Sequence, residues 1–256
     1  MYIRILICLV FSLITTLSAQ EWEQVWADEF NGDTLNEDHW SFELGNGCPD
    51  LCGWGNNELQ IYTSTNHRLE GGKLYITAKK EDGKYTSTKI TTQKKQTFQY
   101  GKFEIRAKLA ISQGLWPAFW LLGENINSAK WPLCGEIDVL EYVGRAPGEI
   151  FTSLHTLSNH GDYAHTKTTT IPNIEEGFHL YTADWNEDSI RFFVDNKLVY
   201  QFAPKEKNMA IWPFNQPFYL LLNLAVGGNF GGEITEESVF PQEFVIDYIR
   251  VFQQAK

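Results

Sequence analysis

Short extended segments separated by turn residues constrain this chain more than any other feature. In Lys73–Lys79 (KLYITAK), Leu74, Ile76 and Ala78 alternate with other residues, and Phe103–Ile111 alternates similarly, as half-buried strands do. The sequence has no convincing long amphipathic helix, so it predicts an all-β fold, a β-sandwich or a jelly roll. Further strands are expected at Phe178–Trp185, Ser189–Val194, Leu198–Phe202, Phe218–Val226 and Phe244–Phe252.

The first residues have the layout of a secretory signal peptide. Arg4 precedes an apolar run from Ile5 to Leu17, and small residues follow up to Ala19. The run is short for a membrane span, although an uncleaved anchor is the alternative. We therefore expect a signal peptide over residues 1–19, a secreted protein (extracellular or periplasmic) and one domain over residues 20–256.

The net charge and the aromatic content limit the classes of molecule that this protein is expected to bind. The formal net charge is −11, which disfavours nucleic acid and anionic membranes as partners and fits a neutral substrate best. Nine tryptophans are many for one domain, and their faces suit sugar rings, although about half of them are expected to be structural. We expect no nucleic-acid partner and no membrane attachment after signal cleavage.

The cysteines predict a local disulfide more readily than a metal site. Cys48 and Cys52 lie in the loop-like stretch CPDLC, where an oxidising compartment would allow them to pair. Cys8 leaves with the signal peptide, and Cys134 is expected to be a small buried residue. The spacing of Cys and His residues does not match a zinc site.

Three acids in the segment WPLCGEIDVLEYVG carry the strongest chemical signal. Glu136 and Asp138 share a face of a regular strand, whereas Glu141 should point the other way. A β-bulge near Val139–Leu140 would bring Glu141 back to the same face. The alternatives are an acidic strand facing solvent and a calcium site, but calcium ligands usually come from loops.

Three carboxyl groups aimed into one cleft suit glycoside hydrolysis. Mutual repulsion should raise at least one pKa, and a retaining mechanism needs one ionised nucleophile and one protonated acid. The backbones of Glu136 and Glu141 should be ~13 Å apart along the strand, which permits converging side chains.

The segment GEIDVLEY at residues 135–142 closely resembles the active-site signature of glycoside hydrolase family 16, in the form seen in laminarinase-type endo-1,3-β-glucanases. The resemblance covers essentially the whole mature chain. It implies a concanavalin A-like β-jelly-roll with an open cleft, and a secreted, endo-acting, retaining hydrolase of 1,3-β-glucan. Other similar segments are GWGNNELQIYT (53–63), YGKFEIRAKL (100–109), GLWPAFWLLG (114–123), SLHT (153–156) and NLAVGGNF (223–230).

The resemblance also assigns roles to the acids and to side chains around them. It implies Glu136 as nucleophile, Asp138 as its helper and Glu141 as acid/base. Trp116 and Trp120 are four residues apart, so a regular strand would put both on one face, although Pro117 can disturb that regularity. Substrate contacts are implied for Asn57, Arg106, Trp116, Trp120, Trp131 and His155. A turn residue, a solvated strand charge and a structural histidine are the alternatives for Asn57, Arg106 and His155.

Many members of this family also carry a structural calcium on the convex face. The matching positions are Glu29, the backbone of Gly72, and Asp247, an oxygen-only set that suits Ca²⁺. The resemblance implies no cofactor for catalysis and β-glucan as partner of a monomer.

The sequence departs from the family pattern at one position, and three other functions on the same fold are alternatives. Leu140 stands where Met is frequent in laminarinase-type members, a change of little volume that should preserve the bulge. A non-catalytic β-glucan-binding module or a lectin-like protein would not need the paired glutamates. A galactanase of the same fold, of the agarase or carrageenase kind, shares the two-residue spacer. Mixed 1,3/1,4-glucan is a further possible substrate.

Overall fold

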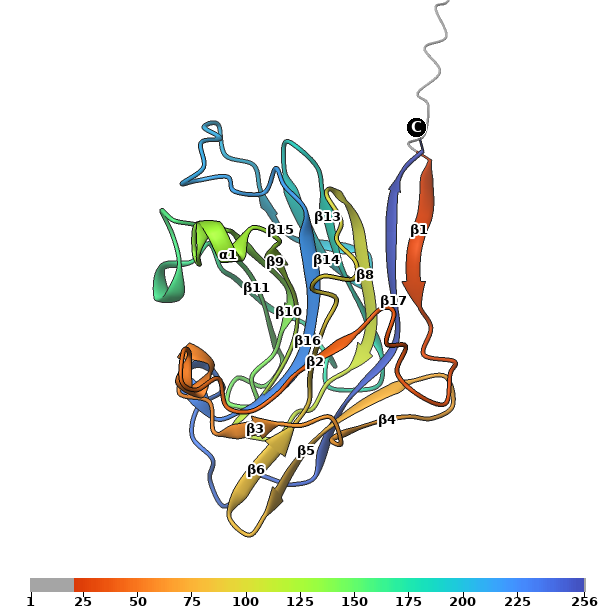
Figure 1. The fold of residues 1–256 in the computed structure, drawn as a ribbon, viewed down its shortest axis with the longest axis vertical. Helices are drawn as coiled ribbons and strands as arrows, with labels where there is room; N and C mark the ends of the chain where they lie inside the picture. The colour runs from red at the N-terminus through yellow and green to blue at the C-terminus, as the bar shows by residue number, and fades with distance from the viewer. Residues whose placement is uncertain (1–20, 256) are drawn as a thin grey trace, which may run out of the picture.

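The computed structural model describes residues 21–255, and these form two β-sheets packed face to face (Figure 1). The predicted all-β sandwich is confirmed. The expected signal peptide, residues 1–19, lies outside the described residues.

One sheet has ten strands, in the order β15-β14-β13-β8-β17-β5-β6-β3, with β1 added beside β17 and β4 beside β5. Its strands are β1 (Trp22–Asp28), β3 (Gln60–Tyr62), β4 (His67–Leu69), β5 (Leu74–Glu81), β6 (Lys84–Ser87), β8 (Gly101–Lys108), β13 (His179–Trp185), β14 (Ile190–Val194), β15 (Lys197–Phe202) and β17 (Gln242–Gln254).

The other sheet has seven strands, in the order β12-β11-β10-β9-β16-β7-β2. These are β2 (Ser41–Glu43), β7 (Lys89–Thr91), β9 (Leu115–Gly123), β10 (Glu136–Glu141), β11 (Glu149–His155), β12 (Lys167–Thr170) and β16 (Phe218–Val226). The helical pieces among the described residues are short: η1 (Cys52–Gly55), α1 (Ile126–Ala129), η2 (Gly161–Tyr163) and α2 (Gly228–Gly231). None of the described helices has the length and apolar character needed to cross a membrane.

The core lies between the sheets. Phe103, Ile105 and Ala107 of β8 face it from one side, and Ile137 and Val139 of β10 face it from the other. Because strand residues alternate, the residues between them point to the two outer surfaces. The outer surface of the seven-stranded sheet is concave and lies on the opposite side of the molecule from that of β8 and β17 (Figure 1).

Candidate active site

A β-bulge in β10 aims the three acids at the same surface. Against β9, Asp138 pairs with Trp120 but Leu140 pairs with Phe119, so one extra residue stands on β10. The pairing with β11 shifts between Asp138 and Glu141 as well. Val139 and Leu140 are both buried in the core. The predicted bulge is therefore confirmed, at the predicted place.

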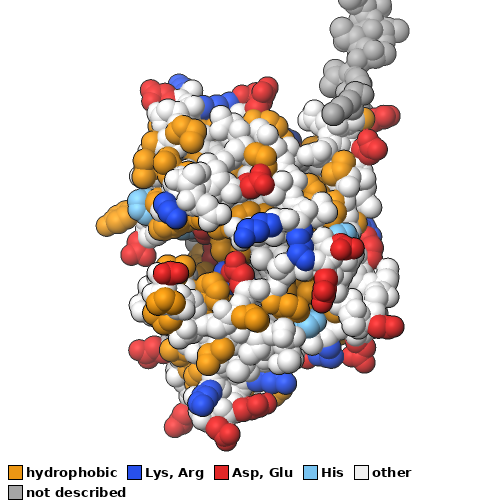
Figure 2. Space-filling model, in the orientation of Figure 1, with side chains coloured by type: hydrophobic (Ala, Val, Ile, Leu, Met, Phe, Trp, Pro, Cys, Tyr) orange, Lys and Arg blue, Asp and Glu red, His pale blue; other side chains and the backbone are white. Residues whose placement is uncertain are grey.

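The acids lie on the concave surface. Figure 2 shows a hollow at the left edge of the molecule, with acidic side chains at its depth and hydrophobic side chains along its rim. Trp116 and Trp120 share this face of β9 despite Pro117, since Trp116 Nε1 donates to Glu141 Oε1 at 3.1 Å and Trp120 stands opposite Asp138. An open cleft with aromatic walls and converging polar groups suits a sugar chain.

Glu136 and Glu141 have different surroundings. Trp131 Nε1 donates to Glu136 Oε2 at 2.9 Å, and Trp131 is 44% exposed, so it can contact both Glu136 and a sugar. Glu141 is deeper and accepts hydrogen bonds from Trp116 and, at 3.2 Å, from the Ser153 hydroxyl. The two carboxyl groups therefore have the separate environments that a nucleophile and an acid need.

His155 lies against the acids, as predicted. Its Nε2 is 3.2 Å from Asp138 Oδ2, an ion pair outside hydrogen-bond geometry, and 3.8 Å from Glu136 Oε1. The Gly161 amide nitrogen lies 3.2 Å from Nδ1, which accepts this hydrogen bond only when the ring is neutral. Donor atoms of Glu136, Asp138 and His155 lie within 4.8 Å of one another, so the group can hold a cation, but a protonated His155 already balances the acids.

Burial dominates the acidity of the carboxyl groups. It raises the pKa of Glu141 to about 8, with the Asp138 charge adding to the rise and His155 opposing it. It raises the pKa of Asp138 to about 7, aided by the Glu136 charge. The pKa of Glu136 also rises through burial, but the His155 charge and the Trp131 hydrogen bond oppose the rise. Burial would lower the pKa of His155, yet the three carboxylates outweigh it and raise that pKa to about 10.

We expect a His155→Gln substitution to move the acid limb of the kcat/KM profile to higher pH. The His155 charge lowers the pKa of Glu136; without it Glu136 keeps its proton to a higher pH, and a nucleophile must be ionised. The profile is measured from pH 4 to 9. His160→Gln is the control, since His160 also packs against Trp131, edge-on at 5.4 Å. An unmoved acid limb in His155→Gln would mean that His155 does not set the charge of Glu136.

Asn57 and Arg106 have different outcomes. Asn57 lies in the loop before β3, and its amide donates to Oδ1 of Asn229, a residue of α2, at 2.9 Å; its contact with substrate stays a prediction. Arg106 was predicted to reach the cleft, and this is wrong. Its neighbours Ile105 and Ala107 face the core, so Arg106 points to the outer surface of the ten-stranded sheet, where it hydrogen-bonds Asp247. Alternation along β8 fixes this direction, and the resemblance alone did not reveal it.

Two of the predicted calcium positions, Glu29 and Asp247, bond arginines of β17 and β8 on that same outer surface. A Cβ at Gly72 would lie 3.0 Å from Asn31 Oδ1, so the loop after Glu29 packs against Gly72. Glu29 accepts two hydrogen bonds from Arg250, at 2.7 and 2.9 Å, and Asp247 is bonded to Arg106. The oxygens suit calcium, but each carboxylate already has a cationic partner, and calcium here stays a prediction.

Ser153 and Lys89 belong to the cleft but were not predicted. Ser153 stands two residues before His155 on β11, so the period of two in SLHT would have indicated it. Lys89 carries no such signal, because β7 is only three residues long. The disulfide between Cys48 and Cys52, which the sequence left open, is present, and Cys134 is free and buried, as predicted.

Comparison with known proteins agrees with this geometry. The model of the glycosyl hydrolases family 16 matches residues 54–250. A β-glucanase of Rhodothermus marinus is 39% identical, over 92% of this chain and 86% of the relative, and a glucan endo-1,3-β-glucosidase of Cryptopygus antarcticus is 40% identical over 83% of each. The crystal structure of a laminarinase from Flavobacterium sp. UMI-01 is 59% identical, covers 90% of this chain and 100% of its own, and superposes with a TM-score of 0.88. The chain therefore belongs to glycosyl hydrolases family 16.

Proposed function

We propose that this protein is an endo-acting, retaining hydrolase of 1,3-β-glucan. The observation that carries the proposal is the bulged strand β10, which turns Glu136 and Glu141 to one face and gives them unlike environments. Retaining glycosidases use such a pair in a double displacement.

The roles follow from the surroundings of each acid. Glu136 faces His155 and receives the Trp131 N–H, both of which favour its charged form, so it attacks the anomeric carbon. The raised pKa of Glu141, about 8, keeps it protonated near neutral pH, so it protonates the leaving oxygen and then activates the water. Asp138 lies close to both Glu136 and His155. Its carboxyl group helps to keep the net charge of the three groups constant while Glu141 gives up and regains its proton. Two carboxylates need no cofactor for this chemistry.

The glucan substrate rests on the relatives and on charge. The relatives compared above are named β-glucanase, glucan endo-1,3-β-glucosidase and laminarinase. A sulfated galactan would need free cations along the cleft, but the net charge is −11, Arg106 lies on the opposite face, and His155 and Lys89 are already paired with carboxylates. Mixed 1,3/1,4-glucan is the second substrate that we expect, with weaker turnover.

The test is a substrate panel. Purified enzyme is incubated with laminarin, lichenan, agarose and κ-carrageenan, and new reducing ends are counted. Laminarin should be cut fastest, lichenan more slowly and the galactans not at all. Proton NMR of the first products should show the β-anomer, and early products should span several lengths. Cleavage of a galactan alone would overturn the substrate, and a first-formed α-anomer would overturn retention.

We also propose that calcium binds at Glu29, the Gly72 carbonyl and Asp247, displacing the arginine partners of the two carboxylates. Calcium at a hundred times its Kd stabilises a protein by about 2.7 kcal/mol, which raises Tm by roughly 5–10 °C in a domain of this size. Melting in calcium and in EDTA measures the shift. An Asp247→Asn variant should lose the calcium-dependent rise in Tm. A wild-type Tm that is the same in calcium and in EDTA would contradict the proposed site.

We propose, finally, that the protein is exported and works as a monomer. The signal-like sequence of residues 1–19 and the Cys48–Cys52 disulfide support export, because disulfides persist in oxidising compartments. N-terminal sequencing of protein from the medium or periplasm and light scattering test the two points; an intact leader or a stable dimer would contradict them.

A further inference from the structure

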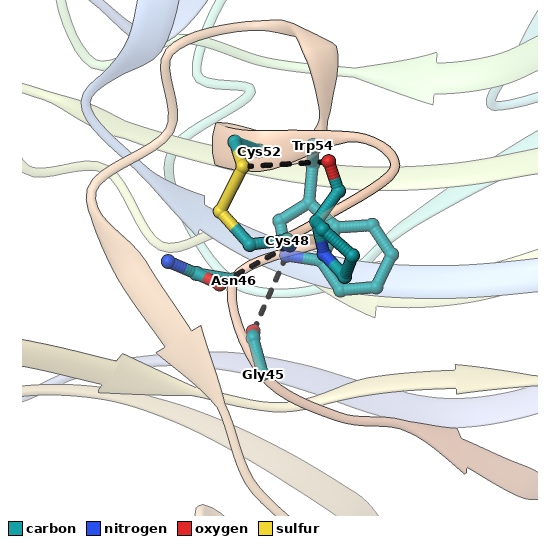
Figure 3. Close-up of a disulfide and its surroundings, with 6 residues drawn as sticks. Gly45, Asn46, Cys48, Cys52 and Trp54 are labelled. Carbon is teal, nitrogen blue, oxygen red and sulfur yellow. Dashed lines mark hydrogen bonds between the residues drawn. A yellow bond between two sulfur atoms is a disulfide. The ribbon is translucent and has the colours of Figure 1, made fainter.

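A disulfide-closed loop stands at one end of the concave sheet. Cys48 and Cys52 are joined in the loop between β2 and β3 (Figure 3). Leu51 N donates to Gly47 O and Gly53 N donates to Asn46 O across the same loop. Gly47 is required there, since a Cβ would lie 2.0 Å from Leu51 O. The loop therefore has a fixed shape, set by several independent constraints.

Trp54 is the side chain that this loop presents. Figure 3 shows its ring beside the disulfide, with Nε1 donating to Gly45 O at 3.4 Å. The ring packs against Tyr62, with centroids 5.4 Å apart. Trp54 has a φ of +54°, an unfavourable conformation for a residue with a Cβ. Such conformations persist where the surrounding structure imposes them, often at ligand sites.

Lys89 links Trp54 to the cleft. Its Nζ lies 4.2 Å from the centre of the Trp54 ring and 5.0 Å from that of Trp120, and it pairs with Glu43 at 2.7 Å. Lys89 is only 7% exposed. The ammonium group is thus held between two aromatic rings, one on the loop and one on the catalytic side of the sheet.

The strand register measures how far this group lies from the acids. Directly paired residues share a face, and one row of pairs runs across the sheet: Glu141, Ala118, Asn223, Lys89 and Glu43. From β10 to β7 the row crosses three strand spacings, ~14 Å. A glucan lying along this row would reach Trp54 with a sugar well removed from the bond that is cut.

Exposure separates Trp54 from the structural tryptophans. Trp40, Trp185 and Trp212 are fully buried, whereas Trp54 is half-buried. Leu51 and Leu59, both exposed, flank it in sequence. An aromatic ring that is held by its neighbours and is still partly exposed is suited to stack on a sugar.

We propose that Trp54 is the platform of a distal glucan-binding subsite, with the Cys48–Cys52 disulfide as the brace that positions it. The inference rests on the proposed function, because it assumes a β-glucan in the cleft. Trp54 is a specificity-determining residue that favours long chains, and it takes no part in bond cleavage. Glu43, whose side chain is 25% exposed, supplies carboxylate oxygens for sugar hydroxyls, and the buried Lys89 holds the Trp54 ring in place.

The test separates binding from chemistry. Wild type, Trp54→Ala, Trp54→Phe and Cys48→Ser/Cys52→Ser are compared on laminarin and on an aryl β-laminaribioside, whose two sugars are too short to reach β7. Trp54→Ala should raise KM for laminarin by about tenfold, the scale of one lost aromatic contact, at unchanged kcat. Trp54→Phe should recover most of the loss, and the double serine variant should fall between. All should match wild type on the aryl substrate.

Each failure has its own signature. An unchanged KM for laminarin in Trp54→Ala overturns the subsite, and an equal loss on both substrates overturns it too, because the loop would then act on the whole fold. If Trp54→Ala does not fold, the double serine variant is compared with wild type on the same two substrates. An unchanged KM for laminarin, or an equal loss on both substrates, would then overturn the proposal. If wild type cuts the aryl substrate but no β-glucan, the proposed function fails instead.

Discussion

Replacing Glu136 by Ser should abolish turnover of laminarin while leaving binding nearly intact. In the proposed mechanism the substitution removes the oxygen that bonds to the anomeric carbon, and the remaining interactions cannot replace it. We expect kcat to fall by roughly 10⁴-fold or more. Affinity for laminari-oligosaccharides should stay within a few-fold of wild type, since Trp116, Trp120 and Trp131 remain. Reducing-end assays measure the first quantity and calorimetry the second.

Azide distinguishes a lost nucleophile from a damaged fold. In Glu136→Ser the shortened side chain leaves space from which azide can attack an aryl β-laminaribioside directly. One displacement inverts the centre, so the product should be the α-glycosyl azide. Glu23→Ser, an exposed acid on β1, is the matched control and should behave as wild type. Substantial hydrolysis by Glu136→Ser without azide would assign the nucleophile elsewhere.

The sequence could predict the acids because their direction depends on local order. Glu136 and Asp138 share a face by alternation, and Glu141 needs one extra residue to join them. Both conditions are readable within one strand. The bulge at Val139–Leu140 is the physical reason that three acids in six residues can act together.

Residues that depend on long-range pairing could not be placed in this way. Arg106 was predicted on the wrong surface because a matching segment gives only a position along the chain. The side that Arg106 faces follows from Ile105 and Ala107, which point into the core. Lys89 acquires its role from Trp54 and Trp120, which come from a loop and from another strand. The CPDLC motif showed that a disulfide was available, but not that it stands behind Trp54.

Substituting Glu141 by Ala should give a variant that is slow on glucan and responsive to azide in the opposite stereochemical sense. Protonation of the leaving oxygen contributes about 10²–10⁴-fold, so hydrolysis of laminarin should fall by a factor in that range. A dinitrophenyl β-laminaribioside has a leaving group that needs no proton. It should still react with Glu136, so the covalent intermediate accumulates and a burst of dinitrophenol precedes a slow steady state.

The stereochemistry of rescue then assigns both glutamates at once. In Glu141→Ala azide attacks the intermediate formed on Glu136, and two successive inversions give the β-glycosyl azide. The same variant should lose the alkaline limb of the kcat/KM profile for laminarin, whose leaving oxygen needs a proton, since the carboxyl group with a pKa of about 8 is gone. Opposite azide products from Glu136→Ser and Glu141→Ala can arise only if each acid works on its own side of the sugar. An α-azide from Glu141→Ala would exchange the two roles, and the raised pKa of Glu141 would then reflect burial without acid catalysis.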